Sequence, residues 1–460
     1  MTSSFVDVGI VESVSDRPRS QTVVLLSSTM SMFGSAVVTS ELFDAIDQAR
    51  SESGALYAPL SRISQQVALQ EKMAEAANPD ATVAQMLPAL TMSKAISQSL
   101  LNDLRTGGAS LRDYATQECR DKFRFLGVNP GRNDEPALTF QESANAPHIL
   151  WDLWYDAGDT LGEVKWESFW GFRLPISHWV MLTRDRRPRI REGLFGGLHE
   201  ALPFAAREFD EVAERIQCSP RKSTADFFHQ YVKEALVASA MSEADADAWL
   251  LSHKDEWLAE FLLDGPGKPA DAEQWKKERL IQMLRALETN YDLLHFACHS
   301  TCNPVLASQS KMTMKVGGQE LAFLLSTMKS NLKSPVKAAN DPGPIIFLNA
   351  CRTADNDQPY EPSPFATSLI MDRGALAVVS PICPVPDFFA RAFALKYYDF
   401  LLGRDAATFG GAPVKGSLSG ALLATRRYFM EQHQNPLGLA YVLYASPGAR
   451  LAPTVQELSA

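Results

Sequence analysis

The sequence has little positive charge. Its 44 Lys and Arg residues are outnumbered by 54 Asp and Glu residues, which gives a formal net charge of -10. The basic residues are scattered, and the cluster at residues 184–191 is short, which is typical of a solvated loop. Proteins that bind nucleic acid need a basic stripe that follows the phosphate backbone. We therefore expect no direct nucleic-acid partner.

Cysteine is also scarce, with 6 residues in a chain of 460 and no regular framework. This usage is typical of reduced thiols inside the cell, so we expect a cytoplasmic location. The N-terminus lacks the basic region and apolar core of a secretory signal. Residues 21–40 carry no charge, but Ser and Thr interrupt them, so they predict a strand at 23–26, a turn and a helix. No membrane is expected as a partner.

Several familiar patterns are missing. We find no internal repeat of fixed period, no low-complexity tract, no Gly-rich phosphate loop and no Ser-His-Asp elbow motif. What remains is an ordinary composition, 46% hydrophobic and 21% charged. A chain of this length and composition indicates a globular protein with a sizeable core and two or three domains.

Helical periodicity dominates the N-terminal part. Apolar residues recur at helical spacing from about 41 to about 120, with breaks at 78–80 and at Gly107-Gly108. A loop rich in Pro, Gly and Asn follows at 129–136 and marks a domain boundary. No catalytic constellation is found here. We expect residues 1–140 to form a mainly helical regulatory or interaction region.

Tryptophans crowd the segment after this boundary. Five of them are Trp151, Trp154, Trp166, Trp170 and Trp179. Large aromatic side chains are more often buried against a sheet than exposed as a binding platform, so core packing is favoured. Next, a strand at 189–195 leads through Gly196-Gly197 and Pro203 into a helix from about 204. Residues 218–290 then predict a charged helical insertion, with helices at 224–239, 243–263 and 272–288.

Strands and helices alternate from residue 291 to the C-terminus. Apolar runs predict strands at 293–298, 345–350, 375–380 and 440–444. Amphipathic patterns predict helices at 319–331, 364–372, 388–402 and 417–430, and Asp387 is well placed to cap the third of these. This alternation predicts an α/β protein with a mostly parallel sheet and helices on both faces.

A histidine and a cysteine end two of these strands. His299 follows the run at 293–298, and Cys351 follows the run at 345–350. In parallel sheets the carboxyl ends of the strands carry the chemistry. A lone buried cysteine is more often inert, but two matching strand ends about fifty residues apart favour a nucleophile with its base. The sequence around Cys351 also shares its Ala-Cys-Arg core with the signature of caspases.

Zinc is an alternative use of the same region, because His295, Cys298, His299 and Cys302 lie close together and zinc binds Cys and His. In a strand, however, His295 and Cys298 would point to opposite faces. We therefore expect no metal site and no cofactor.

Several segments together resemble the CHAT domain, a group of caspase-like cysteine peptidases related to separase. Residues 295–300, His-Phe-Ala-Cys-His-Ser, and 347–354, Phe-Leu-Asn-Ala-Cys-Arg-Thr-Ala, resemble its two catalytic motifs. The resemblance extends to 149–156, 374–379, 384–387 and 441–447, so the domain is expected at 148–452. It implies a caspase-like α/β/α sandwich and a Cys-His dyad formed by Cys351 and His299.

The resemblance also implies the rest of the site. Backbone N–H groups of Ser300 and Cys351 would hold the oxyanion, although caspase-type enzymes have glycine where this chain has Ser300. Asn349, Asp387 and Glu200 would line the substrate pocket, where acidic walls favour Arg or Lys. Asp387 could equally serve as a helix cap and Glu200 could be merely solvated, while Asn349 could accept uncharged side chains.

Two functions are compatible with these observations. The first is a cysteine endopeptidase that cleaves specific protein substrates, is triggered by a protein regulator or other signal, and acts in a defence or cell-death pathway as the resemblance implies. The second is a catalytically silent caspase-like scaffold that binds protein partners through residues 218–290. The presence of both His299 and Cys351 favours the enzyme.

Overall fold

The computed structural model describes residues 5–13, 20–27, 34–36, 57–77, 83–114, 137–141, 150–156, 162–179, 193–202, 204–217, 221–301, 307–331, 343–352, 364–371, 375–409, 412–445 and 449–451. The strands are β1 Phe5–Ser13, β2 Ser20–Ser27, β3 Gly34–Ala36, β4 Ala137–Gln141, β5 Ile176–Trp179, β6 Leu194–Leu198, β7 Arg221–Ser223, β8 Leu293–Thr301, β9 Lys311–Val316, β10 Gln319–Leu324, β11 Ile345–Arg352, β12 Ala377–Pro381, β13 Thr408–Phe409, β14 Ala412–Pro413 and β15 Tyr441–Ala445. The α-helices are α2 Tyr57–Ala77, α3 Val83–Met86, α4 Lys94–Tyr114, α6 Trp170–Arg173, α7 Ala205–Ile216, α8 Thr224–Ala238, α9 Glu243–His253, α10 Trp257–Asp264, α11 Ala272–Asn290, α12 Leu325–Asn331, α13 Pro364–Met371, α14 Asp387–Leu402 and α15 Leu418–His433.

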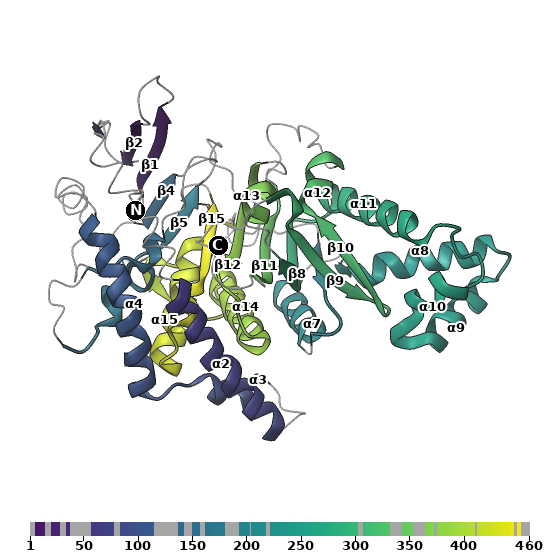
Figure 1. Cartoon of the computed structure of the whole chain (residues 1–460), viewed down its shortest axis with the longest axis horizontal. Coiled ribbons are helices and arrows are strands. Elements are labelled where there is room, and N and C mark those ends of the chain that lie inside the picture. The colour runs from purple at the N-terminus through teal and green to yellow at the C-terminus, as the bar shows by residue number, and fades with distance from the viewer. Residues whose placement is uncertain are drawn as a thin grey trace, which may run out of the picture.

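One large sheet organises the described residues. Its 13 strands follow the order β10-β9-β8-β11-β12-β15-β5-β4-β1-β2-β3, and β6 and β7 join through β8. The strands β7, β6, β8, β11 and β12 are mutually parallel, whereas β15 runs antiparallel to β12. The predicted class, an α/β protein with a mostly parallel central sheet, is confirmed (Figure 1).

Helices cover both faces of the central strands. A Cβ atom on Gly196 would lie 2.5 Å from the ring of Phe209 in α7, so α7 packs on that face. The neighbouring residue Phe195 points the other way and packs on Phe227 of α8, with ring centroids 5.7 Å apart. Residues 345–348 of β11 are correspondingly no more than 1% exposed. This burial on both faces explains the unbroken apolar runs of the sequence.

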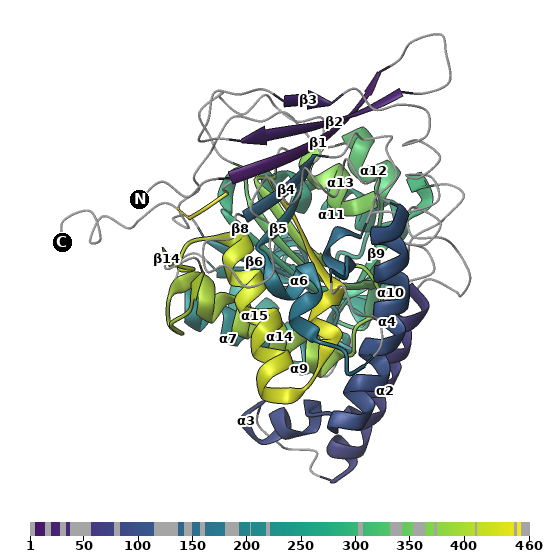
Figure 2. The same ribbon diagram turned by 90° about the vertical axis from the view of Figure 1, so that its left-hand side faces the viewer.

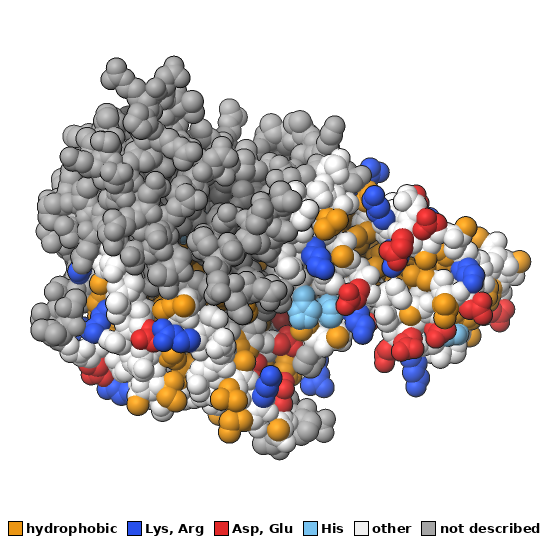
Figure 3. Space-filling model, in the orientation of Figure 1, with side chains coloured by type: hydrophobic (Ala, Val, Ile, Leu, Met, Phe, Trp, Pro, Cys, Tyr) orange, Lys and Arg blue, Asp and Glu red, His pale blue; other side chains and the backbone are white. Residues whose placement is uncertain are grey.

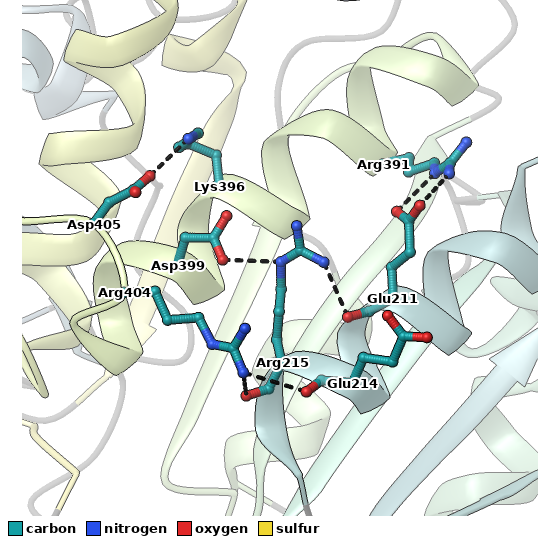
Figure 4. A network of polar contacts seen from close by, with 8 residues as sticks. All are labelled: Glu211, Glu214, Arg215, Arg391, Lys396, Asp399, Arg404 and Asp405. Atoms are coloured by element: carbon teal, nitrogen blue, oxygen red, sulfur yellow. Dashed lines mark hydrogen bonds and ion pairs between the residues drawn. The ribbon is translucent and has the colours of Figure 1, made fainter. Parts of the chain in front are cut away.

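Ion pairs join the two helices that lie on one of these faces. Arg391 of α14 pairs with Glu211 of α7 at 2.7 Å, and Arg215 of α7 pairs with Asp399 of α14 at 2.9 Å (Figure 4). Arg404 adds hydrogen bonds to the carbonyl groups of Glu214 and Arg215 at the end of α7. The two helices are therefore held together beneath the sheet as one layer.

The N-terminal part contains strands as well as helices. Strands β1, β2 and β3 extend the sheet beyond β4, and α2 and α4 run along the side of the molecule (Figure 2). The strand predicted at 23–26 lies within β2, whereas the helical pattern at 41–56 lies outside the described residues. The predicted break at Gly107-Gly108 is wrong, because α4 continues through both glycines. A Cβ atom on Gly108 would lie 2.2 Å from the carbonyl oxygen of Leu153, so the glycine allows α4 to pack closely against that residue.

A β-hairpin takes the first half of the helix predicted at 319–331. Strands β9 and β10 pair antiparallel around Gly317 and Gly318, whose φ angles of 52° and 80° suit a two-residue turn. The second half of the predicted segment, from Leu325, is helical as α12. The apolar residues at 312, 314, 316, 321 and 323 alternate with more exposed ones, and this period of two belongs to a half-buried strand.

The helical insertion projects from one end of the molecule (Figure 1). Its helices α8, α9, α10 and α11 match the predicted ones closely, apart from a short 3-10 turn between α9 and α10. They enclose a small core of their own, in which Trp275 packs on Phe228 and Phe261 with ring centroids 6.1 and 5.7 Å away. The segment is thus a folded arm with its own apolar centre.

Three of the clustered tryptophans are buried, as core packing predicts. Trp154 stacks between Trp151 and Trp170, with ring centroids 5.7 and 4.9 Å away. All three are at most 7% exposed. None of the described helices is both long and apolar enough to cross a membrane.

Candidate active site

Three parallel strands end at the same edge of the sheet. β8 lies between β6 and β11, and its register pairs His299 with Cys351 directly across the β8–β11 ladder. Neighbouring strands are about 4.8 Å apart, so the backbones of these two residues are adjacent. The condition that the His and Cys strands be neighbours is therefore met. Their catalytic role remains a prediction.

His299 is half-buried, and its nearest aromatic neighbour is a second histidine. The ring of His199 lies 4.5 Å from that of His299 between centroids, at an interplanar angle of 69°. His199 directly follows β6, and its side chain is 6% exposed. His199 was not among the predicted site residues, because the strand was predicted to end at Phe195, with Gly196-Gly197 after it. In the structure both glycines lie within β6, while residues 189–192 of the predicted strand lie outside the described part.

Ser300 connects β8 and β11 through its side chain. Its hydroxyl is buried and donates a hydrogen bond of 3.2 Å to the carbonyl oxygen of Ala350, the residue before Cys351. The side chain of Ser300 thus stabilises the strand pairing at the edge where the dyad is predicted. The predicted use of its backbone N–H as an oxyanion donor remains untested.

A buried polar network lies beneath this edge. Oε1 of Glu208 in α7 accepts a hydrogen bond from the side-chain amide of Asn349. The same oxygen lies 2.7 Å from Nε2 of His295. The same amide donates to the carbonyl oxygen of Ala390 at 3.0 Å, and the hydroxyl of Tyr441 donates to Oδ1 of Asn349 at 2.7 Å. These contacts join β8 and β11 to α7, α14 and β15. Asn349, 4% exposed, is held in the core, and its predicted role in the substrate pocket remains a prediction.

The zinc alternative finds no support in the described residues. His295 is fully buried between Glu208 and the hydroxyl of Tyr398, and Cys298 is buried as well. No group of three or more His, Cys, Asp or Glu residues that could hold a metal occurs in the part of the chain that the structure describes. Cys302 lies outside that part.

Asp387 is the first residue of α14 and does not cap that helix, which corrects the capping interpretation. Its carboxylate instead accepts the backbone N–H of Phe204, 3.1 Å away at the start of α7. Burial, reinforced by the nearby charge of Glu208, raises the pKa of Asp387 to about 7. The carboxyl group therefore changes charge near neutral pH. Its predicted contact with substrate remains untested.

Glu200, predicted to line the pocket, holds the hairpin turn. Its carboxylate accepts the N–H of Gly317 at 2.7 Å. Burial raises the pKa of Glu200, and this hydrogen bond opposes the shift. The carbonyl of Gly317 in turn accepts the N–H groups of Leu258 and Ala259 in the first turn of α10, at 3.1 and 2.8 Å. The turn at Gly317 thus contacts both α10 of the helical insertion and Glu200, the residue after His199.

An N-terminal helix also reaches this region. Glu71 of α2, 6% exposed, accepts the N–H of Phe389 in the first turn of α14 at 2.8 Å. Burial raises the pKa of Glu71 to about 8, and the neighbouring Asp387 and Glu75 add to the shift. No sequence pattern marked this contact, because its partners are 318 positions apart.

Comparisons with known proteins give a family and a weak structural likeness. The model of the CHAT domain family matches residues 198–436. No curated protein sequence matches the chain. Among solved structures, the crystal structure of the Arg specific cysteine proteinase gingipain R (RgpB) is similar at a TM-score of 0.31 and 11% sequence identity, covering 74% of this chain and 70% of that chain.

Proposed function

The chain belongs to the CHAT domain family, and from this premise we propose that it is a cysteine endopeptidase whose dyad is Cys351 and His299. The observation that carries the proposal is the β8–β11 register, which sets the two residues opposite each other at the carboxyl edge of a parallel sheet. Ligands and reactive groups of open α/β sheets lie at that edge. A nucleophile needs its base within hydrogen-bond reach, and adjacent strands allow this.

The proposed reaction is peptide hydrolysis in two stages. His299 takes the proton of the Cys351 thiol, and the thiolate attacks the carbonyl carbon of the scissile bond. Backbone N–H groups of Ser300 and Cys351 would hold the negative oxygen of the tetrahedral intermediate. His299 then gives its proton to the leaving amine, and water hydrolyses the thioester to release the acid and restore the thiol.

We propose that Asp387, Glu200 and Asn349 select the side chain before the scissile bond. A carboxylate wall would favour Arg or Lys through charge-assisted hydrogen bonds. Because the pKa of Asp387 is raised to about 7, a cationic side chain would bind better as the pH rises through neutrality. A preference for uncharged side chains would instead point to Asn349.

The protein substrate, the regulator and a role in defence or cell death rest on the family and are part of the proposal. Two contacts offer routes for control. Glu71 joins α2 to α14, and the turn at Gly317 joins α10 to Glu200. A regulator that bound the N-terminal helices or the insertion could therefore act on the residues around the dyad.

Labelling by a thiol-directed peptidyl acyloxymethyl ketone tests the proposal. Wild-type protein, with and without a suspected partner, should be labelled at Cys351, and labelling should be lost in Cys351→Ala and His299→Ala. The buried Cys383 provides a matched control, since Cys383→Ala should label normally. Absence of Cys351 labelling under every triggering condition would instead favour the silent scaffold.

A further inference from the structure

His199 is placed to control the predicted base. Its ring packs edge to face against that of His299, and it comes from the neighbouring strand end. Nδ1 of His199 is buried and has no hydrogen-bond partner among the described residues. Figure 3 shows histidine side chains gathered on the face between the body of the molecule and the projecting insertion. The contact thus joins a buried histidine, His199, to the half-buried His299 at the edge of the sheet where β11 ends.

The backbone of His199 is fixed on both sides. Its N–H donates to the carbonyl of Ala297 in β8 at 2.9 Å, and its carbonyl accepts the N–H of Leu202 at 2.8 Å. Residue 199 also forms a bridge with Lys315 of β9. Because β6 and β9 share one side of β8, these backbone contacts fix the Cα atom of His199 beside β8. From this fixed position the ring of His199 covers one side of the His299 ring.

The charge state of His199 suits this place. Burial lowers the pKa of His199, and the adjacent His299 lowers it further, as does Lys315, while Glu320 acts in the opposite sense. Burial therefore favours the uncharged form of the His199 ring, which packs against His299.

We propose that His199 is a positioning residue whose ring, packed against that of His299, limits the rotation of the His299 ring and keeps it available to Cys351. This inference rests on the proposed Cys-His dyad. The step concerned moves one proton from the Cys351 sulfur to His299, which leaves a thiolate and an imidazolium ion. His199 exchanges no proton and acts only through His299. Loss of its ring would let His299 rotate away and would return the Cys351 thiol toward its ordinary pKa of about 8.5.

The test is the pH profile of Cys351 alkylation by iodoacetamide in the full-length protein, with the modified residue located by mass spectrometry. Wild type should show a reactive thiolate well below pH 8. In His199→Ala the midpoint should rise by about one pH unit, and the rate at about pH 6 should fall about tenfold. His199→Phe keeps an aromatic wall, so its profile should stay within about threefold of wild type. His253→Ala, which removes a histidine stacked on Trp249 in the insertion, is the matched control.

The outcomes separate this inference from the proposed function. If wild-type Cys351 shows no thiolate below its ordinary pKa, the dyad itself fails. If wild type shows it and His199→Ala leaves the midpoint unchanged, only the role of His199 is overturned, whatever happens to thermal stability. A His199→Phe profile identical to that of His199→Ala would also overturn positioning by ring packing.

Discussion

The carboxyl group of Glu71 gives a prediction that can be worked out from the structure. It is buried against the first turn of α14, and its pKa is raised from 4.5 to about 8. A carboxyl group with a raised folded pKa keeps its proton when the unfolded chain has lost it. Stability is therefore unaffected below about pH 4.5 and falls as the pH rises through this window, levelling off above about pH 8. The docking of α2 should weaken with rising pH.

Glu71→Gln removes this dependence and keeps an oxygen that can accept the N–H of Phe389. Each pH unit within the window corresponds to about 1.4 kcal/mol for one proton, so between about pH 6 and pH 8 the variant should gain about 3 kcal/mol relative to wild type. The gain is at most this large, because Asp387 also loses its proton near pH 7 and its charge acts on the pKa of Glu71.

Hydrogen exchange in the peptide that spans 57–77 measures this difference. Comparison of variant and wild type at the same pH cancels the intrinsic exchange rate. At about pH 8, α2 should exchange more slowly in Glu71→Gln than in wild type, and at about pH 5 the two should be similar. Glu163→Gln is the control, since Glu163 pairs with Lys94 at the surface with its side chain 60% exposed. A difference between variant and wild type that stays constant from pH 5 to pH 8 would refute the buried carboxyl contact.

Two further substitutions, the first with a control variant, test the connections around the proposed dyad. In Gly317→Ala, a Cβ atom would lie 2.7 Å from Trp257 at a φ of +52°, so thermal unfolding should show a loss of about 2–3 kcal/mol. In Gly416→Ala, at φ +74°, the added Cβ would lie no closer than 3.5 Å to the carbonyl oxygen of Leu451, so the variant should lose only the backbone part, about 1 kcal/mol, and equal losses would show that the hairpin turn is not packed on α10. Asn349→Ala leaves buried partners unsatisfied and should cost about 2–4 kcal/mol in urea unfolding. A cost below about 1 kcal/mol would contradict the buried network.

The strands that carry His299 and Cys351 could be predicted because their pattern is local. Residues 293–298 and 345–350 are largely apolar, each with one polar residue, and both lie in parallel strands that are buried. The helix predicted at 417–430 was also a local pattern, and it corresponds to α15, Leu418–His433, with Ser417 as its cap. These signals depend on the residue itself and its immediate neighbours in the chain.

The role of glycine was misinterpreted at positions where close packing, and not a turn, requires a residue without a side chain. A Cβ atom on Gly197 would lie 2.1 Å from the ring of Phe296 in the next strand. The glycine therefore lies inside β6. Because the strand was predicted to end too early, His199 was not recognised as a residue at a strand end. Sequence alone does not show which distant ring approaches a glycine.

The polar contacts behind the site could not be predicted for a related reason. Glu208 meets Asn349 across 141 positions, and Glu71 meets Phe389 across 318. Each side chain is unremarkable in its local pattern, since Glu208 lies on a charged helix and Glu71 on an amphipathic one. Their hydrogen bonds form only because tertiary packing buries both side chains next to distant partners.

Cleavage of a diverse peptide library, followed by mass spectrometry of the new termini, tests the central claim most directly. It should be run with wild type and Cys351→Ala at about pH 8, in the presence of the suspected partner. The account predicts cleavage by wild type alone, with enrichment of Arg or Lys before the scissile bond if Asp387 and Glu200 line the pocket. Cleavage that persists in Cys351→Ala, or no cleavage by wild type under any triggering condition, would contradict the claim that this chain is a Cys351-dependent peptidase.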